Sequence, residues 1–489
     1  MLAPTACDRA CAGSGPAAKP MPVAAAVSRT AARPRARTGV LAFVTAFAGV
    51  LTVALLHSAK IFYYDSGGYW GLGQTFTQGG HFSLLNFNSP LRGYLLPLID
   101  HLLQQLAIGL SWNYSSSAKL FNALTFSLIG TVLAPRLAEI AWPQIRWGIG
   151  RRLALTVLLL IFWNGYLDFP LSDFPALAMA LLALISIDRP ESPSWMLVAG
   201  LACAASIEMR PSYLLLAPML AVLVFWRWAE QRAWRDGLRR RGLCLALLIA
   251  GFVIVSLPQS LSSHRHFGTW SFVPGSTAHL SSLQFTEGLR LQRYETFVGS
   301  GHPPRMLYDD PSGSRLLDRQ QNQTITGTGQ YLGLVASHPI AMAGVFARHL
   351  INGLDQRYST PYVAHLDTGS QRWLRVAGFL LIFLALVRVL WAPARRRLDR
   401  ARWRYAVVFG LCCATSIPSA VESRYLLPAF LLSYMLVLLP GWPSPLDGRA
   451  TSLRRYRTVA ALAVSLVVFM GVVIYVTSQA SGHLHFGAV

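Results

Sequence analysis

The sequence predicts an all-α polytopic membrane protein with about 11 transmembrane helices and two large extracytoplasmic loops that carry interfacial helices. Of its 489 residues, 53% are hydrophobic and only 13% are charged. Apolar stretches of about 15 to 20 residues recur along the chain, which is the length needed to cross a hydrocarbon core about 30 Å thick. Basic residues are concentrated in the short connections between these stretches. Together these features exclude a soluble globular domain.

The first segment, residues 1–38, is rich in Ala, Pro and Arg. It has little apolar surface to bury, so we expect a disordered cytoplasmic tail. Its charged part is too long for a signal peptide, and no small-residue cleavage site follows it. We therefore expect the first span to be an uncleaved anchor.

Eleven apolar stretches are the expected spans. An N-terminal transmembrane module occupies 39–258 and C-terminal transmembrane helices occupy 373–477. The spans lie at 39–58, 117–135, 152–167, 172–187, 195–208, 212–226, 242–258, 373–391, 405–420, 424–440 and 458–477.

Arginine clusters precede the odd-numbered spans, whereas the connections of opposite parity hold few basic residues. By the positive-inside rule the clusters are cytoplasmic, as is the N-terminus, and the final segment 478–489 is an outer tail. The net charge of +22 thus marks topology, and no basic face for nucleic acid is expected. We expect a multi-pass protein of the cell membrane, specifically a bacterial inner membrane.

This topology leaves two large outer loops, 59–116 and 259–372. In the first loop, residues 90–111 carry Asp100 and His101 and suit an amphipathic interfacial helix better than a span. In the second loop, the apolar spacing from Tyr331 to Asp355 predicts helix along the membrane surface, interrupted at His338 and Pro339.

Acidic and basic residues gather in four connections on the predicted outer side, in a chain that is otherwise poor in acids. They are Asp65; Asp168 and Asp173; Glu208 and Arg210; and Glu422 and Arg424. Arginine binds phosphate oxygens with two parallel hydrogen bonds, and a carboxylate can take a proton from an attacking alcohol. These residue types therefore suit a site that handles a phosphate and an activated hydroxyl.

A structural interpretation of the same residues stays open. Glu208 with Arg210, and Glu422 with Arg424, are spaced to form local ion pairs that only satisfy each other. Asp173 comes shortly before a proline, as an ordinary helix start does.

Four short motifs on the outer side resemble those of one enzyme family. They are Tyr64-Asp65 followed by Tyr69, Ser172-Asp173, Met209–Tyr213, and Glu422–Pro428. With them the chain resembles, over about residues 40–440, the GT-C superfamily of integral-membrane glycosyltransferases. The similarity is to the branch of protein O-mannosyltransferases and lipid A aminoarabinose transferases. It implies that Asp65 is catalytic and that Asp173, or alternatively Asp168, is the second acidic site residue.

The resemblance implies transfer of a sugar, with inversion, from a polyprenyl-phosphate donor to a lipid, glycan or protein hydroxyl at the outer membrane face. Asp65 would be the general base, and Asp173 would position acceptor or sugar. Arg210 and Arg424 would hold the phosphate. Further substrate contacts are expected from Tyr64, Tyr69, Glu422 and Tyr425.

The chain departs from the family at one position. Ser66 follows Asp65 where many members have a second acid, so a metal site built from adjacent carboxylates is not expected. A divalent metal stays an open alternative, and the sequence indicates no other cofactor.

Two other functions stay open. A transporter or flippase for a polar or lipid-linked solute would use the arginines as substrate contacts, and it predicts polar groups along the spans. A polysaccharide polymerase or ligase would instead depend on arginines of the second outer loop, such as Arg290, Arg293, Arg305 and Arg315.

Overall fold

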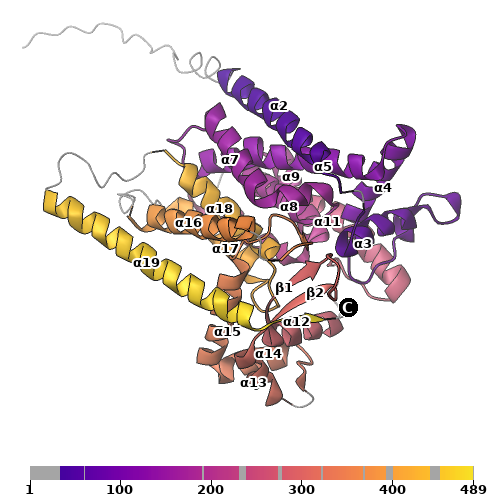
Figure 1. Cartoon of the computed structure of the whole chain (residues 1–489). Helices are drawn as coiled ribbons and strands as arrows, with labels where there is room; N and C mark the ends of the chain where they lie inside the picture. The colour runs from indigo at the N-terminus through magenta and orange to yellow at the C-terminus, as the bar shows by residue number, and fades with distance from the viewer. Residues whose placement is uncertain are drawn as a thin grey trace, which may run out of the picture.

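The computed structural model describes residues 33–59, 61–189, 192–230, 238–273, 278–320, 323–366, 369–391, 400–440 and 452–487. Helices dominate these residues, as predicted (Figure 1). Most of the predicted tail, residues 1–32, lies outside them, and α2 begins at Arg33.

The N-terminal module is a set of packed helices (Figure 1). They are α2 (Arg33–Leu56), α5 (Tyr114–Leu128) continued through a π-helical turn into α6 (Ala134–Ala141), α7 (Ile149–Trp163), α8 (Asp173–Ser186), α9 (Pro193–Met209), α10 (Leu216–Glu230) and α11 (Leu238–Phe267). Helices α9 and α11 approach closely at two glycines. A side chain at Gly200 would collide with the backbone of Leu248, and one at Gly251 with that of Leu197. Small residues permit this packing between apolar helices.

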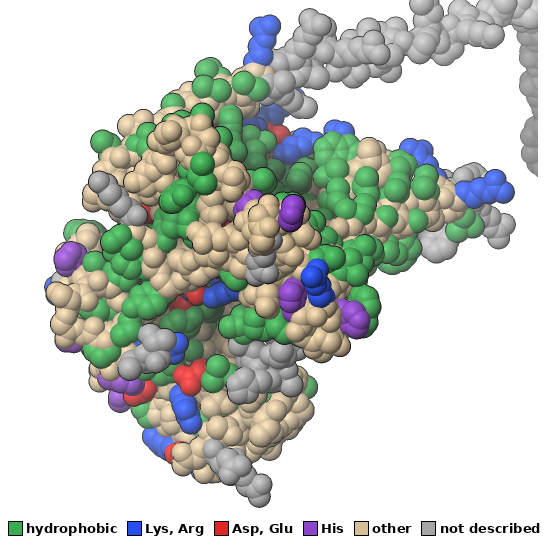
Figure 2. Space-filling view, turned by 90° about the vertical axis from the view of Figure 1, so that its right-hand side faces the viewer, with side chains coloured by type: hydrophobic (Ala, Val, Ile, Leu, Met, Phe, Trp, Pro, Cys, Tyr) green, Lys and Arg blue, Asp and Glu red, His purple; other side chains and the backbone are tan. Residues whose placement is uncertain are grey.

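The C-terminal helices are α16 (Gly369–Trp391), α17 (Arg400–Ala414), α18 (Leu427–Leu438) and α19 (Ser452–Gly482). Helix α19 runs along the edge of the structure (Figure 1). It exposes Val464, Val467 and Tyr475 by 62%, 71% and 66%. Hydrophobic side chains are exposed over much of the face in Figure 2, as a lipid-facing surface requires.

A helix overlaps each of the predicted spans, and several are long and apolar enough to cross a membrane. Six pass this test within the described residues, or seven if one bent pair is a single span, so the count of eleven is not confirmed. The difference comes from short helices. Helix α8, for example, has 14 residues and is about 21 Å long, less than the hydrocarbon thickness.

The predicted first outer loop contains α3 (Tyr64–Gly73), the 3₁₀ helices η2 (Gln74–Gly80) and η3 (Leu84–Asn86), and α4 (Leu95–Gly109). Helix α4 lies within residues 90–111, the segment predicted to form the interfacial helix, but it begins five residues later and ends two residues earlier. Its polar face is turned inward, because His101 Nδ1 lies 3.0 Å from the Gly73 carbonyl and Gln104 donates to the Trp70 carbonyl. Leu102 and Ile108 on the outer face are 59% and 58% exposed. A helix with its polar side chains facing the protein and its apolar side chains facing outward suits a position against lipid.

The predicted second outer loop is more regular than the sequence indicated. It holds α12 (Ala278–Arg290), β1 (Leu291–Phe297), β2 (Arg305–Asp309), α13 (Pro311–Asp318), α14 (Thr328–Ser337), α15 (Pro339–Gly353) and β3 (Tyr362–Val363). Helix α11 also runs past the predicted loop start at residue 259. The break at His338 is found as predicted, with a bend of 110° between α14 and α15.

A small sheet that sequence analysis did not predict organises this region. It has four strands in the order β3-β1-β2-β4 (Figure 1). Strand β1 pairs antiparallel with β2 and parallel with β3, and β2 pairs antiparallel with β4 (Leu484–Gly487). Strand β4 belongs to the predicted outer tail, so this tail packs against the second outer loop.

Candidate functional site

Four segments that are far apart in sequence bring the predicted charged residues together at helix ends. Asp65 lies in the first turn of α3, and Asp173 is the first residue of α8. Arg210 follows the last residue of α9, and Arg424 lies in the 3₁₀ helix η9 (Ser423–Leu426) before α18. The contacts below define this charged cluster.

Asp65 is held by two arginines from different segments. Arg424 Nη2 donates to Asp65 Oδ2 at 2.9 Å and also to Glu422 Oε1 at 2.8 Å. Arg92, in the connection before α4, donates to the other carboxylate oxygen of Asp65 and to the Tyr69 hydroxyl at 3.1 Å. Both oxygens of Asp65 are thus engaged by guanidinium groups.

The environment of Asp65 keeps it ionised. Burial raises the pKa of this carboxyl, but the charges of Arg424 and Arg92 and their hydrogen bonds outweigh burial and lower the pKa to about 2. The side chain of Asp65 is 31% exposed, against 8% for Arg424. Asp65 therefore lies at the accessible edge of the cluster, and it is a weak base while both arginines are bound to it.

A second carboxylate–arginine pair lies beside the first. Arg210 pairs with Asp173, whose side chain is 1% exposed. The guanidinium carbon of Arg210 lies 4.9 Å from the centre of the Tyr425 ring, and that of Arg424 lies 5.7 Å from the same centre. Tyr425 therefore contacts both arginines through its ring.

Three predicted residues are placed differently. Asp168 lies away from these contacts, with His57 Nδ1 at 2.9 Å and Lys119 Nζ at 3.4 Å. It therefore joins α5 and the residue that follows α2 to the segment before α8. Tyr64 is 47% exposed, and its ring centre lies 6.5 Å from that of Tyr362. Glu208 is buried, and within the described residues Arg210 forms its ion pair with Asp173 and none with Glu208.

Of the two expected local pairs, only the one between Glu422 and Arg424 forms. Their atoms Oε2 and Nε lie 2.6 Å apart. Because Arg424 also reaches Asp65, this contact is part of the cluster and does more than satisfy two neighbouring charges.

Arg92 is a site residue that the sequence did not predict. It lies in the same outer loop as Asp65, next to Gly93, whose position against the Glu208 backbone leaves no room for a side chain. The signal in the sequence was a basic residue in a predicted outer connection that should hold few.

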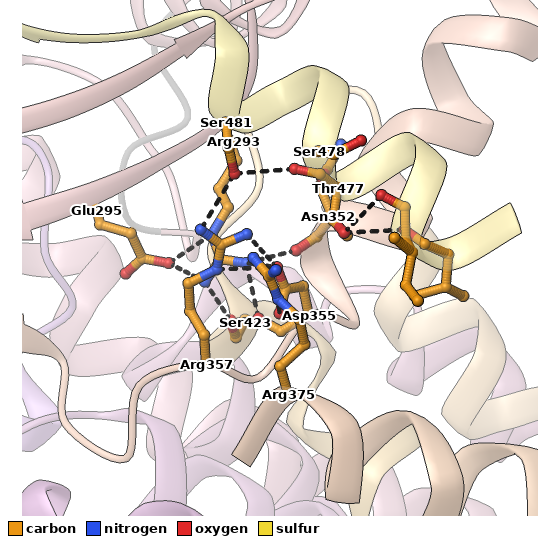
Figure 3. A network of polar contacts seen from close by, with 12 residues as sticks. Arg293, Glu295, Asn352, Asp355, Arg357, Arg375, Ser423, Thr477, Ser478 and Ser481 are labelled. Carbon is orange, nitrogen blue, oxygen red and sulfur yellow. Dashed lines mark hydrogen bonds and ion pairs between the residues drawn. The ribbon is translucent and has the colours of Figure 1, made fainter. Parts of the chain in front are cut away.

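A buried network, also missed, anchors the chain next to Arg424 (Figure 3). Arg293, 1% exposed, donates to Glu295 Oε1 at 2.7 Å, to the Asp355 carbonyl at 2.7 Å and to Ser423 Oγ at 3.1 Å. The Asp355 carboxylate accepts from Arg357 and Arg375. Burial raises the pKa of Asp355, but these arginines and Arg293 outweigh it and lower the pKa. Ser423 lies between Glu422 and Arg424, so the region of Arg293 holds this segment of the site in place.

The charged cluster is electrically balanced. Its members are three arginines and three acids, namely Arg92, Arg210, Arg424, Asp65, Asp173 and Glu422. In the described part of the chain, no group of three or more His, Cys, Asp or Glu side chains is placed to hold a metal ion. What the cluster offers is arginine donors for an anion and one accessible carboxylate.

The fold and this cluster define a multi-pass, mostly helical membrane protein with a charged site at converging helix ends. Comparison of the chain with protein-family models gave no match, and comparison with curated proteins gave no significant match.

Proposed function

We propose that this protein is a GT-C-type glycosyltransferase that moves a sugar from a polyprenyl-phosphate donor to a hydroxyl acceptor at the outer face of a cell membrane. The observation that supports this most is the Asp65 carboxylate held between Arg424 and Arg92. Both arginines suit a phosphate as well as they suit a carboxylate. The Asp65 side chain is 31% exposed, so a substrate can reach it.

In the proposed reaction, the donor phosphate takes over hydrogen bonds that Asp65 accepts from Arg424 and Arg92. The cluster is balanced, so one added phosphodiester anion leaves it with an excess negative charge. Both changes raise the pKa of Asp65 from about 2 towards the ordinary value of an aspartate. Donor binding thereby makes Asp65 a stronger base.

The base then accepts the proton of the acceptor hydroxyl as its oxygen attacks the anomeric carbon of the sugar. The bond from that carbon to the phosphate oxygen breaks, and its electron pair stays on polyprenyl phosphate. Arg424 and Arg92 stabilise the negative charge that develops there. A single displacement of this kind inverts the anomeric configuration.

The buried acid takes a different role from the one the resemblance implies. Asp173 is 1% exposed and paired with Arg210, so in this proposal it orients Arg210 and does not touch the acceptor. Arg210 and Arg424 in turn contact the Tyr425 ring. The acceptor class, a lipid, glycan or protein hydroxyl, is part of the proposal.

The test is transfer of labelled sugar from a polyprenyl-phosphate donor by the purified full-length protein in lipid. We expect Asp65→Asn to lower the rate by about 100-fold to 10,000-fold, the usual contribution of a general base. Asp309→Asn is the matched control, because Asp309 is 47% exposed on β2 and lies outside the cluster. Equal activity of the two variants would refute the role of Asp65.

A further inference from the structure

Helix α3, which carries Asp65, begins without a cap from its own side chains. Its N-cap residue is Tyr63, whose backbone is extended, with φ −100° and ψ 150°, but whose side chain makes no capping hydrogen bond. A short polar side chain at this position usually accepts a hydrogen bond from a backbone N–H two or three residues further on. The first-turn N–H groups of α3 therefore need an acceptor from another part of the chain.

That acceptor is the hydroxyl of Tyr362 on strand β3, which is 296 residues from Ser66 in the sequence. The backbone N–H of Ser66 donates to this hydroxyl at 3.0 Å, and the hydroxyl donates to the Tyr63 carbonyl at 2.8 Å. The same N–H lies 2.9 Å from the Tyr63 carbonyl oxygen. Ser66 is the third residue of α3, so its N–H is one that an N-cap side chain commonly binds. The two hydrogen bonds of Tyr362 thus reach both sides of Asp65.

The Tyr362 side chain is held firmly in this position. Its ring centre lies 4.6 Å from that of Phe169, edge to face, and 5.7 Å from that of Tyr63. Strand pairing places Tyr362 opposite Thr296 of β1. Tyr362 is 4% exposed, and burial raises the pKa of its hydroxyl to about 12. The hydroxyl therefore keeps its proton at neutral pH and can both donate and accept.

The backbone inside this turn is strained at Tyr64. Its φ is +37°, in the left-handed region that a bulky side chain rarely adopts. Such a conformation persists only where the surrounding contacts hold it. Tyr362 bonds the residue before Tyr64 and the second residue after it. Because Asp65 follows Tyr64 directly, relaxation of this turn would move the Asp65 carboxylate relative to its two arginines.

We propose that Tyr362 is a positioning residue for Asp65: its hydroxyl caps the first turn of α3 and so keeps the Asp65 carboxylate between Arg92 and Arg424. In this role Tyr362 acts through α3 and needs no contact with a substrate. The expected effect on sugar transfer rests on the proposed function, whereas the cap is a property of the fold that can be measured without a substrate.

The test is hydrogen–deuterium exchange, read by mass spectrometry, of the purified full-length protein in detergent. Tyr362→Phe removes the hydroxyl and keeps the ring. We expect the amides of α3 to exchange about fivefold faster in this variant, as the usual contribution of a helix cap implies. Tyr308→Phe is the matched control. Tyr308 lies on β2 of the same sheet and is 1% exposed, and among the described residues its hydroxyl has no hydrogen-bond partner.

Transfer kinetics distinguish positioning from a general loss of stability. Tyr362→Phe should lower kcat about tenfold and leave KM for the donor within about twofold, because a misplaced base weakens the transition state and not donor binding. Tyr308→Phe should keep both constants. A merely structural role would lower the melting temperature and speed exchange throughout the protein, with no preference for α3.

The outcomes separate the cap, the positioning of Asp65 and the proposed function. Unchanged exchange of α3 in Tyr362→Phe, or an equal change in Tyr308→Phe, would overturn the cap. Faster exchange of α3 with unchanged kcat would overturn the positioning of Asp65. If the wild type transfers no sugar, the proposed function fails, and exchange still decides whether Tyr362 caps α3. If Tyr362→Phe does not fold, the wild type decides, because a Ser66 amide that exchanges as fast as an unprotected amide would refute the cap.

Discussion

Arg424 is the residue whose removal tests the charged cluster most severely. Its guanidinium serves two carboxylates, Asp65 at 2.9 Å and Glu422 at 2.8 Å, and its own side chain is 8% exposed. The Glu422 side chain is 3% exposed. In Arg424→Gln, Glu422 would become a buried charge without its cation.

The expected cost follows from this burial. Removing one partner of a buried ion pair typically costs about 3–5 kcal/mol of unfolding free energy, because the remaining charge stays desolvated. Asp65 contributes little to that cost, since it keeps Arg92 and is 31% exposed. If the unpaired Glu422 is the reason, then Glu422→Gln combined with Arg424→Gln should recover most of the loss.

The measurement is the free energy of unfolding of the full-length protein by SDS titration in detergent micelles. Wild type, Arg424→Gln, Glu422→Gln and the double variant form a double-mutant cycle. The reasoning is refuted if Arg424→Gln costs less than about 1 kcal/mol, or if the double variant is as unstable as Arg424→Gln. In either case Arg424 would not be needed to stabilise the buried charge of Glu422.

Three further predictions concern residues around the cluster. Because the pKa of Asp65 is lowered from 3.8 to about 2, its ion pairs stabilise the fold fully above about pH 4 and lose this effect as pH falls through about 2. In Arg92→Gln this loss of stability should occur at a higher pH, and acid titration followed by circular dichroism would detect the shift. An unchanged titration curve would contradict the ion pair between Arg92 and Asp65. Asp168→Asn should lower the melting temperature, because buried Lys119 loses its charge partner, yet reduce transfer far less than Asp65→Asn; activity loss of the same size would make Asp168 a site residue. Arg305→Ala should keep near-normal transfer, since this exposed arginine on β2 lies outside the cluster, whereas complete inactivation would favour a polymerase or ligase that uses the outer loop.

The helical membrane architecture was predictable because span length and hydrophobicity are local properties of the sequence. The helix α4 and the break between α14 and α15 were predictable for the same reason: amphipathic spacing and proline act within a few residues. The number of crossings was not, because it depends on whether short helices such as α8 reach both sides of a membrane.

The site was predictable only in part. Basic clusters alternate between connections, and this alternation predicted that Asp65, Asp173, Arg210 and Arg424 lie on one side of the membrane. The structure brings these four residues together. Which acid meets which arginine was not predictable, because Arg210 bypasses the nearby Glu208 to reach Asp173.

The strands and the network around Arg293 were missed for a different reason. Strand β1 pairs with residues that are distant in sequence, including Val363 of β3, and β2 pairs with β4, more than 170 residues further along the chain. Periodicity within one loop carries no information about such pairing. A polar loop with turn-forming residues therefore resembled irregular chain, although it supports Ser423 beside the site.

The central claim is that Asp65 accepts the hydrogen bonds of Arg424 and Arg92 until the donor phosphate takes its place. The most direct test is to measure binding of polyprenyl phosphate to Asp65→Asn. We expect this variant to bind polyprenyl phosphate at least as tightly as the wild type while transferring almost no sugar, because its arginines no longer have a competing carboxylate. Loss of polyprenyl phosphate binding in Asp65→Asn, with the fold intact, would contradict the claim.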